Sequence, residues 1–210
     1  MRILEKYDLF IFDWDNTLTT STLVVRVTQL VNKWRKGKRA RKVRDFERKK
    51  VLEGITISED FSKLYSLLDD VYSVFSKPVL KKSTVELLKF LKKNKKKVAI
   101  FSDSKTYRLF KETRELGVLR YFDYVLTAES IKRYKPNPAG LFLLLDKSKT
   151  KEARSIYIGD MASDVSTAKY AGMDSLAVSD GVDSHSELAA AKPSYLFRSL
   201  DEFLKAFKKQ

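Results

Sequence analysis

The fold is decided by the stretch Leu9-Phe10-Ile11-Phe12-Asp13-Trp14-Asp15-Asn16-Thr17. Its first four residues form an apolar run without strict alternation, which is typical of a strand buried on both faces. The run leads directly into two carboxylates, Asp13 and Asp15. Carboxylates this close to a buried strand are unfavourable unless a cation compensates their charge. Taken alone, the stretch predicts either a charged site at a strand end or an ordinary Asx-type turn.

Five further apolar runs follow, and segments with helical periodicity separate them. The expected strands are 9–12, 98–101, 124–127, 155–158, 176–178 and 195–197. The expected helices are 85–91, 106–116, 138–145, 163–171, 187–191 and 200–207. Such alternation predicts right-handed crossovers and a parallel sheet with helices on both faces. We therefore expect an α/β fold, a three-layer doubly wound parallel sheet that binds ligands beyond the carboxyl ends of its strands.

Residues 20–80 break this alternation. Apolar residues recur there at helical spacing on both sides of two interruptions, near Gly37 and Gly54. We expect a core of residues 1–19 and 81–210, with a small helical cap at 20–80 inserted after the first strand. An insert at this point would overhang the rim that carries Asp13.

The composition excludes several classes of protein. The chain has 210 residues and no cysteine, which excludes disulfides, thiol catalysis and Cys-ligated zinc. It has no apolar run of about 18 residues and no secretory signal pattern, so we expect a soluble cytoplasmic protein. Asn and Gln together number six, whereas Lys, Arg and Glu abound, a bias that suits a thermophile.

The net charge of +15 is spread unevenly, because residues 21–80 hold 14 Lys/Arg against 7 Asp/Glu, or +7, and the other 150 residues carry +8. The stretch from Lys33 to Lys50 holds eleven basic and two acidic residues. A solvated helical face is the favoured interpretation, and contact with nucleic acid or another polyanion is the alternative.

A second acidic pair follows the strand at 155–158. Asp160 comes directly after Gly159, and Asp164 lies one helical turn later on the same side of the next helix. N-capping of that helix would also explain the pair. Two weaker signals are Ser102, at the end of the second strand, and Lys135, just before a helix start fixed by two prolines.

These four motifs, in this order, resemble those of the haloacid dehalogenase superfamily. The resemblance rests on Asp13-x-Asp15-x-Thr17, Ser102, Lys135-Pro136-x-Pro138 and Gly159-Asp160-x-x-x-Asp164, and covers residues 8–20 and 80–208. The Gly181-Val182 stretch and the last strand and helix look like those of phosphoglycolate-phosphatase-type members. The resemblance implies a Rossmann-like core with a cap and a phosphatase activity.

The resemblance also implies a role for each motif residue. Asp13 would be the nucleophile that forms an aspartyl-phosphate, and Asp15 would exchange protons with the leaving alcohol and the attacking water. Magnesium would be bound by Asp13, Asp160 and the backbone carbonyl of Asp15, with Asp164 orienting a metal-bound water. The phosphoryl oxygens would be bound by Thr17, Ser102 and Lys135.

Four residues near the motifs need separate interpretation. Asn16 stands where Gly is common in such phosphatases, and Asn tolerates unusual backbone angles. Asp103 replaces a frequent Asn and would repel phosphate unless it turns away or pairs with Lys105. Trp14 should point away from the two carboxylates and pack in the core. His185, the only histidine, is interpreted as a loop residue entering a helix.

Several functions compete at this stage. Asp15 and Asp160 argue against a dehalogenase, which needs neither. The favoured function is hydrolysis of small phosphate monoesters, phosphoglycolate-like or sugar phosphates. A phosphomutase of the same superfamily is one alternative, and a phosphatase or binding protein directed at nucleic acid through the basic insert is another.

Overall fold

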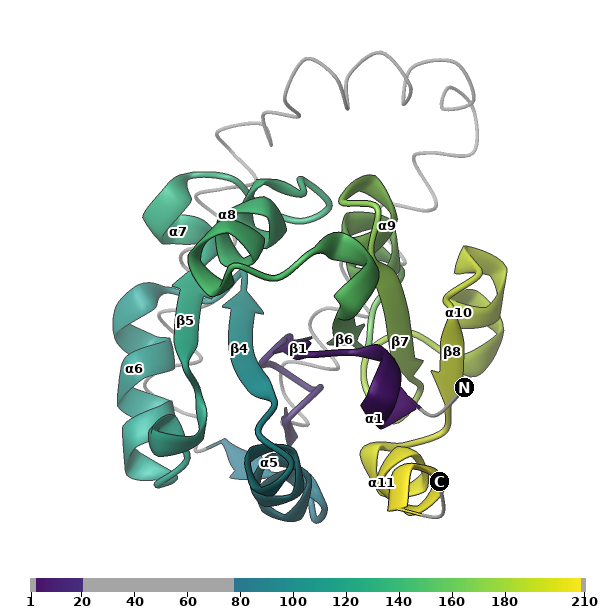
Figure 1. The fold of residues 1–210 in the computed structure, drawn as a ribbon, viewed down its shortest axis with the longest axis horizontal. Helices are drawn as coiled ribbons and strands as arrows, with labels where there is room; N and C mark the ends of the chain where they lie inside the picture. The colour runs from purple at the N-terminus through teal and green to yellow at the C-terminus, as the bar shows by residue number, and fades with distance from the viewer. Residues whose placement is uncertain (1–2, 21–77, 209–210) are drawn as a thin grey trace.

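The computed structural model describes residues 3–20 and 78–208, which form an α/β fold (Figure 1). Six strands pair in parallel in the order β5-β4-β1-β6-β7-β8. From left to right in Figure 1 they are β5 (Tyr124–Thr127), β4 (Lys97–Ser102), β1 (Leu9–Phe12), β6 (Ser155–Gly159), β7 (Asp174–Val178) and β8 (Tyr195–Phe197). The six strands expected from the apolar runs are therefore confirmed.

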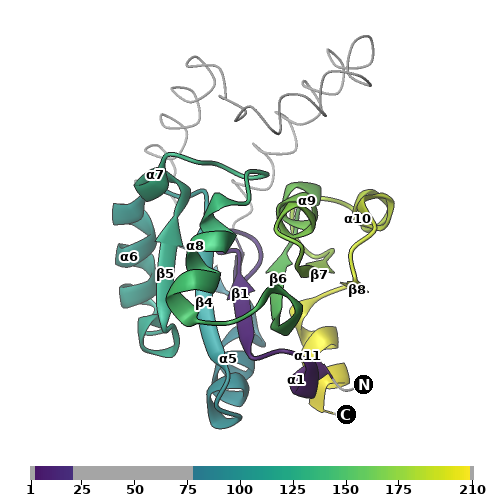
Figure 2. The same ribbon diagram turned by 45° about the horizontal axis from the view of Figure 1, so that its top comes forward.

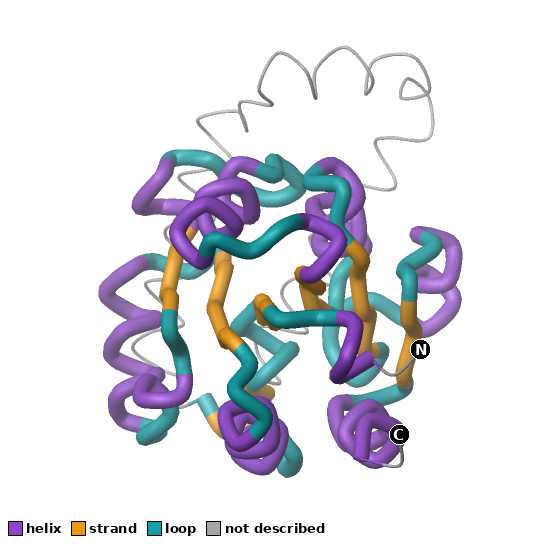
Figure 3. The backbone as a smooth tube through the Cα atoms, in the orientation of Figure 1, coloured by secondary structure: helices purple, strands orange, loops and turns teal. Residues whose placement is uncertain are grey.

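Helices connect these strands and cover the sheet, as the tube in Figure 3 shows. The long helices are α5 (Thr84–Lys93), α6 (Thr106–Glu115), α8 (Ala139–Ser148), α9 (Ala162–Tyr170), α10 (His185–Ala191) and α11 (Leu200–Lys208). The expected helices match these six to within a few residues at each end. Single turns that carry no periodicity were not expected, namely α1 (Ile3–Lys6), α7 (Ala128–Ile131) and the 3₁₀ turns Leu119–Tyr121 and Glu152–Arg154.

Alternate residues of the central strand β1 pack into two separate hydrophobic cores, one on each face of the sheet. Phe10 and Phe12 pack with apolar side chains of α5, α6 and α11 on one face. Leu9 and Ile11 pack with side chains of α8 and α9 on the other. All four are fully buried, which explains why β1 is apolar at every position. This arrangement is the expected three-layer α/β sandwich.

The strands point toward the end of the molecule that carries α7 and α9. Figures 1 and 2 both place α7 and α9 at this end and α5 and α11 at the opposite one. The residues that follow β1, β4 and β6 consequently lie at the same rim of the sheet. In an open α/β sheet this rim is where ligands bind.

A short two-stranded ribbon joins the two ends of the segment inserted after β1. The strands β2 (Thr19–Thr20) and β3 (Val79–Leu80) pair antiparallel. Thr84 Oγ1 and the Lys81 backbone N–H both donate to the Leu18 carbonyl, which ties the ribbon to the core. The helical cap predicted at 20–80 lies almost entirely outside the described residues, as does the basic stretch from Lys33 to Lys50.

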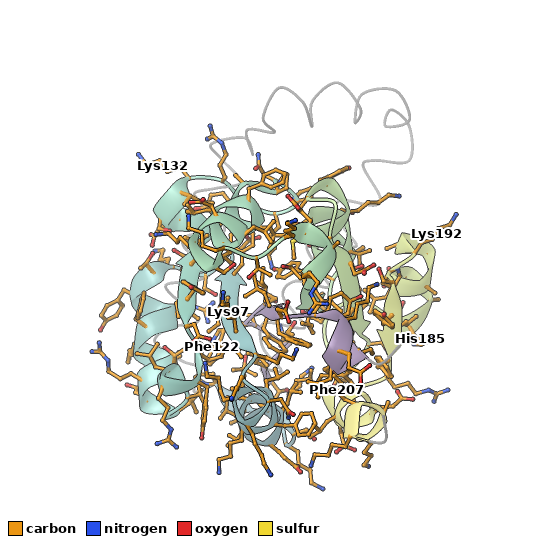
Figure 4. All side chains as sticks on the ribbon, viewed as in Figure 1. Lys97, Phe122, Lys132, His185, Lys192 and Phe207 are labelled. Carbon is orange, nitrogen blue, oxygen red and sulfur yellow. The ribbon has the colours of Figure 1, made fainter. Side chains whose placement is uncertain are left out.

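Charged helix ends face solvent around this core. Lys132 and Lys192 end α7 and α10 in left-handed backbone conformations, and their side chains extend outward (Figure 4). Phe207 of α11 instead stacks on Phe203 within the core, with ring centroids 5.0 Å apart. Within residues 3–20 and 78–208, no helix combines the length and apolar character that a bilayer crossing requires.

Candidate active site

Three neighbouring strands carry the predicted site residues at their carboxyl ends. Asp13 follows β1, Ser102 is the last residue of β4, and Asp160 follows β6. The sheet extends past Phe12, because the Asp13 backbone N–H donates to the Ile158 carbonyl at 2.8 Å. The pairing of β1 with both neighbours thus fixes where the Asp13 side chain begins.

Asp13 is buried and touches one cation. Its Oδ1 lies 2.8 Å from Lys135 Nζ, and its Oδ2 lies 3.4 Å from the Thr17 hydroxyl. Burial raises the pKa of Asp13 well above its usual range, although the Lys135 ammonium acts in the opposite direction. Neighbouring Asp164 and Asp160 add to the increase. A second cation near Asp13 would therefore stabilise its ionised form.

Two separate segments of the chain donate hydrogen bonds to the Asp160 carboxylate. Its Oδ2 accepts a 2.7 Å hydrogen bond from the Val182 backbone N–H, and its Oδ1 accepts one of 2.9 Å from Thr17. Position 181 requires glycine, because a Cβ there would overlap the Asp160 carboxylate. Burial and the Asp164 carboxylate raise the pKa of Asp160 to about 7. The Gly181-Val182 stretch noted in the sequence is thus a wall of this site.

Asp164 lies in the first turn of α9, as the spacing predicted. Its Oδ2 accepts hydrogen bonds from the backbone N–H groups of Asp160 (3.1 Å) and Met161 (2.9 Å). Its Oδ1 accepts from Lys135 Nζ at 2.8 Å and from the Tyr157 hydroxyl at 3.3 Å. One Asp164 oxygen therefore caps the helix, as the capping interpretation predicts, and the other faces Lys135.

Lys135 reaches this cluster from the loop before α8. Its side chain is buried and bridges Asp13 and Asp164. Burial alone would lower the pKa of Lys135, but these two carboxylates outweigh it and raise the pKa well above the usual range. Lys135 is therefore a permanent positive charge at the rim.

The cluster has more negative charge than Lys135 can neutralise. Asp13, Asp160 and Asp164 each offer one oxygen, and these three oxygens lie within 4.8 Å of one another. Against three buried carboxylates, the described residues place one ammonium in direct contact. Two negative charges remain when all three are ionised, so the cluster could hold a divalent cation with oxygen ligands.

Ser102 and Asp103 lie beside this cluster. The Ser102 hydroxyl is buried and lies 2.8 Å from that of Ser104. Asp103 Oδ1 accepts a 3.2 Å hydrogen bond from the Lys135 backbone N–H. Burial raises the pKa of Asp103 to about 6, against the effect of Lys135. A carboxylate at this position thus anchors the Lys135 loop.

Asp15 belongs to a network that the sequence did not predict. Arg108 of α6 holds both of its oxygens, and Ser104 Oγ donates to Oδ2 at 2.5 Å. Burial would raise the pKa of Asp15, but Arg108 and Ser104 outweigh it and lower that pKa. Arg108 and Glu112 lie on the buried face of α6 together with Leu109. Charged residues at helical spacing on an otherwise apolar face are the sequence feature that could have predicted this buried network.

Three of the remaining interpretations can be compared with the structure. Asn16 has φ 58°, the left-handed conformation that Asn tolerates. Trp14 is fully buried in the core, and its Nε1 donates to Glu112 at 2.6 Å. His185 is exposed at the first turn of α10, where Figure 4 shows it at the outer edge of the sheet.

The chain matches a known protein family over most of its length. The family model for haloacid dehalogenase-like hydrolases matches residues 10–178. The chain belongs to this family. All seven site residues named from the sequence lie within the matched range.

Known relatives of this haloacid dehalogenase-like hydrolase agree with the assignment. A phosphoglycolate phosphatase of Vibrio parahaemolyticus is 27% identical over 159 residues, which cover 72% of this chain and 70% of the relative. One of Pseudomonas fluorescens is 27% identical over 115 residues, 55% of this chain and 42% of the relative. The chain thus matches less than half the length of the Pseudomonas protein.

Solved structures show the same fold. A predicted phosphatase from Clostridium acetobutylicum superposes with a TM-score of 0.73 at 20% identity, covering 98% of this chain and 100% of the other. A predicted phosphoglycolate phosphatase from Haemophilus somnus has a TM-score of 0.71 at 20% identity, with 97% and 98% covered.

Proposed function

We propose that this haloacid dehalogenase-like hydrolase is a magnesium-dependent phosphatase that cleaves small phosphate monoesters through an aspartyl-phosphate on Asp13. The observation that supports this most directly is the position of Lys135, whose Nζ lies 2.8 Å from both Asp13 and Asp164. A cation beside a buried carboxylate at the rim can attract a phosphoryl group to that carboxylate. Phosphoryl transfer depends mainly on such positioning and charge neutralisation.

The carboxylate cluster fits magnesium as the second cation. Asp13 and Asp160 would hold it, together with the backbone carbonyl of Asp15, and waters and the substrate would complete the octahedron that magnesium prefers. Asp164 would orient a bound water, since the backbone N–H groups of Asp160 and Met161 already fix the direction of its carboxylate. When bound, magnesium would polarise the phosphoryl group and neutralise the excess negative charge.

The reaction proceeds in two displacements. In the first, an Asp13 oxygen forms a bond to phosphorus and the ester P–O bond breaks. The departing alcohol oxygen takes a proton from Asp15, which has to be protonated when this step begins although Arg108 and Ser104 lower its pKa. In the second, a water oxygen attacks the same phosphorus, and the Asp13–phosphorus bond breaks as Asp15 accepts a proton from the water. Inorganic phosphate leaves, Asp13 is again ionised, and Asp15 again carries the proton with which it entered the first step.

Three side chains would bind the phosphoryl oxygens. Lys135 supplies a charge that its raised pKa keeps in place at neutral pH. The hydroxyl of Thr17 is buried in the turn after β1, and that of Ser102 is buried at the end of β4, where both can donate hydrogen bonds. These donors are preorganised by packing, so they lose little conformational freedom when the substrate binds.

The relatives support a small substrate. Those of Vibrio and Pseudomonas are named phosphoglycolate phosphatases, which places phosphoglycolate first among the substrates to test. Sugar phosphates come second.

The test is a panel of phosphorylated metabolites assayed with magnesium for release of inorganic phosphate. We expect turnover of at least one small monoester, and a hydroxylamine-sensitive phosphoryl group on Asp13 after acid quench. Transfer of that group to a sugar phosphate, with no release of phosphate, would indicate a phosphomutase instead. Absence of both activities across the panel would refute the proposal.

A further inference from the structure

Asp15 is held by a bidentate ion pair from α6. Arg108 NH1 lies 2.9 Å from Asp15 Oδ1, and NH2 lies 2.5 Å from Oδ2. The planar fork of a guanidinium fixes the orientation of a carboxylate as well as its position, which a lysine cannot do. Arg108 therefore determines the direction in which the Asp15 oxygens point.

Arg108 is itself fixed from the opposite side. Its NH1 lies 3.0 Å from Glu112 Oε1, one turn further along α6, and Glu112 Oε2 accepts the Trp14 Nε1–H at 2.6 Å. Arg108 and Glu112 are 3% and 4% exposed, so solvent does not weaken these contacts. Because Trp14 and Asp15 are adjacent in the chain, α6 holds the first acidic motif at two successive residues.

One Asp15 oxygen has room for a proton in this arrangement, although Arg108 and Ser104 lower the pKa of the carboxyl group. Among the described residues, Oδ2 accepts hydrogen bonds from Arg108 and Ser104, whereas Oδ1 accepts one from Arg108. A carboxylate oxygen has two lone pairs, so one on Oδ1 stays available. Proton transfer requires that this lone pair point at the substrate oxygen, within hydrogen-bond distance.

We infer that Arg108 is a positioning residue for the proposed reaction, one that aims the Asp15 carboxylate at the oxygen of the leaving alcohol. This inference rests on the proposed phosphatase function and adds a residue to it. The competing explanation is purely structural, in which Arg108 neutralises a buried charge and joins α6 to the core. The two explanations predict different losses of rate when Arg108 is replaced, because only the positioning role makes the loss depend on the leaving group.

A poor leaving group reveals the role of the proton donor. An alkyl alcohol must be protonated as its bond to phosphorus breaks, whereas p-nitrophenol leaves readily as the anion. Correctly placed general acids contribute about 100-fold or more to rate. A misdirected Asp15 should therefore slow the first displacement of an alkyl phosphate much more than that of p-nitrophenyl phosphate, and a general loss of structure should slow both equally. The second displacement is the same for both esters, so the comparison uses kcat/KM.

The experiment compares Arg108→Gln with the wild-type protein on p-nitrophenyl phosphate and on the best alkyl phosphate found in the panel. We expect kcat/KM, which reports the first displacement alone, to fall about 100-fold on the alkyl ester and less than about 5-fold on the aryl ester. Arg108→Lys keeps the charge without the fork, so its ratio of losses should lie between those of wild type and Arg108→Gln. Asp15→Asn should show the same selectivity, and combining it with Arg108→Gln should add little.

The matched control is Glu112→Gln, which disturbs the same buried network without touching Asp15. We expect its losses, whatever their size, to be equal on the two esters. Equal losses in folded Arg108→Gln would overturn the inference and leave the proposed function intact. If Arg108→Gln does not fold, a wild-type ratio in Arg108→Lys has the same consequence. A wild-type protein that cleaves neither ester refutes the proposed function, and this inference with it.

Discussion

Lys135 Nζ lies 2.8 Å from Oδ1 of Asp13, although the two residues are 122 positions apart in the chain. This contact joins the loop before α8 to the end of the central strand. It pairs the buried Asp13 carboxylate with an ammonium group that could also bind a phosphate group. The ammonium lowers the pKa of the buried Asp13, but burial outweighs it and keeps that pKa well above its usual range, so a second cation is needed to stabilise the ionised carboxylate.

The first prediction concerns Asp13 itself. If its oxygen attacks phosphorus, Asp13→Asn should lower kcat by at least ~1,000-fold, which corresponds to about 4 kcal/mol of activation free energy. The fold should persist, because the substitution removes one of several mutually repelling carboxylates. Steady-state kinetics and thermal unfolding measure the two effects. A folded variant that keeps a tenth of the wild-type turnover would contradict the assignment of Asp13 as the nucleophile.

The second prediction concerns the metal. A chelator should abolish turnover, and magnesium should restore it. Magnesium should also raise the midpoint of thermal unfolding, because it binds only the folded cluster. In Asp160→Asn we expect both responses to require a higher magnesium concentration.

Asp146→Asn is the control for this experiment. Asp146 lies on α8 in an exposed ion pair with Lys149, so its loss should change neither response. Full turnover of the wild-type protein in excess chelator would show that the carboxylate cluster has another role.

The third prediction uses the close approach at Gly181. An added Cβ would overlap the Asp160 carboxylate, so Gly181→Ala should displace Asp160 and raise the magnesium concentration needed for half-maximal activity. Gly117→Ala is the matched control. Gly117 has φ +68°, and no described atom lies within 4 Å of the place that an added methyl would take, so alanine there strains only the backbone. We expect it to lower the unfolding midpoint and leave the magnesium requirement unchanged.

Much of the fold could be predicted because its signals are local. Residues 9–12 of β1, 98–101 of β4 and 156–158 of β6 are all apolar and fully buried, since both faces of these strands are covered. The ribbon of β2 and β3 could not be predicted in the same way. Each strand is two residues long, and the pairing of Thr20 with Val79 depends on the tertiary fold rather than on any nearby pattern.

The site residues divide in the same way, into those predicted from local patterns and those brought together only by the tertiary fold. Strand ends placed Asp13 and Asp160 at one rim, and one helical turn placed Asp164 beside them. The approach of Lys135 followed only from the family resemblance, because the path of a loop has no sequence period. Arg108 was missed for a similar reason. Its partner Asp15 is 93 positions away, and only the crossover geometry of α6 brings them together.

The fourth prediction concerns the basic stretch in the sequence outside the described residues. We replace Lys38, Arg39, Arg41 and Lys42 together with Gln. If these residues form a solvated face, catalytic efficiency on a small monoester should change little near 0.15 M salt, where charges more than about 8 Å apart are screened. Binding to a short single-stranded oligonucleotide should be weak in both proteins and should fall as salt rises. Submicromolar binding by the wild type, lost in the variant, would instead favour a polynucleotide substrate.

The last prediction is a pH dependence at Asp103. Burial raises the pKa of this carboxyl to about 6, above its value near 4 in an unfolded chain. Between these values the folded state binds more protons than the unfolded state, so the free energy of unfolding must fall as pH rises through this window. Below about pH 4 both states are protonated and the effect is absent.

Asp103→Asn isolates this effect, because the amide oxygen can still accept the hydrogen bond from the Lys135 backbone. A two-unit shift corresponds to ~3 kcal/mol, and the partial exposure of Asp103 reduces our expectation to about 1–2 kcal/mol of added stability at pH 7. Chemical denaturation of both proteins from pH 4 to pH 8, with chelator present, measures the difference. It should be close to zero at pH 4 and reach its full value above pH 6. A difference that stays constant across this range would mean that Asp103 does not titrate there, and that the substitution acts through packing alone.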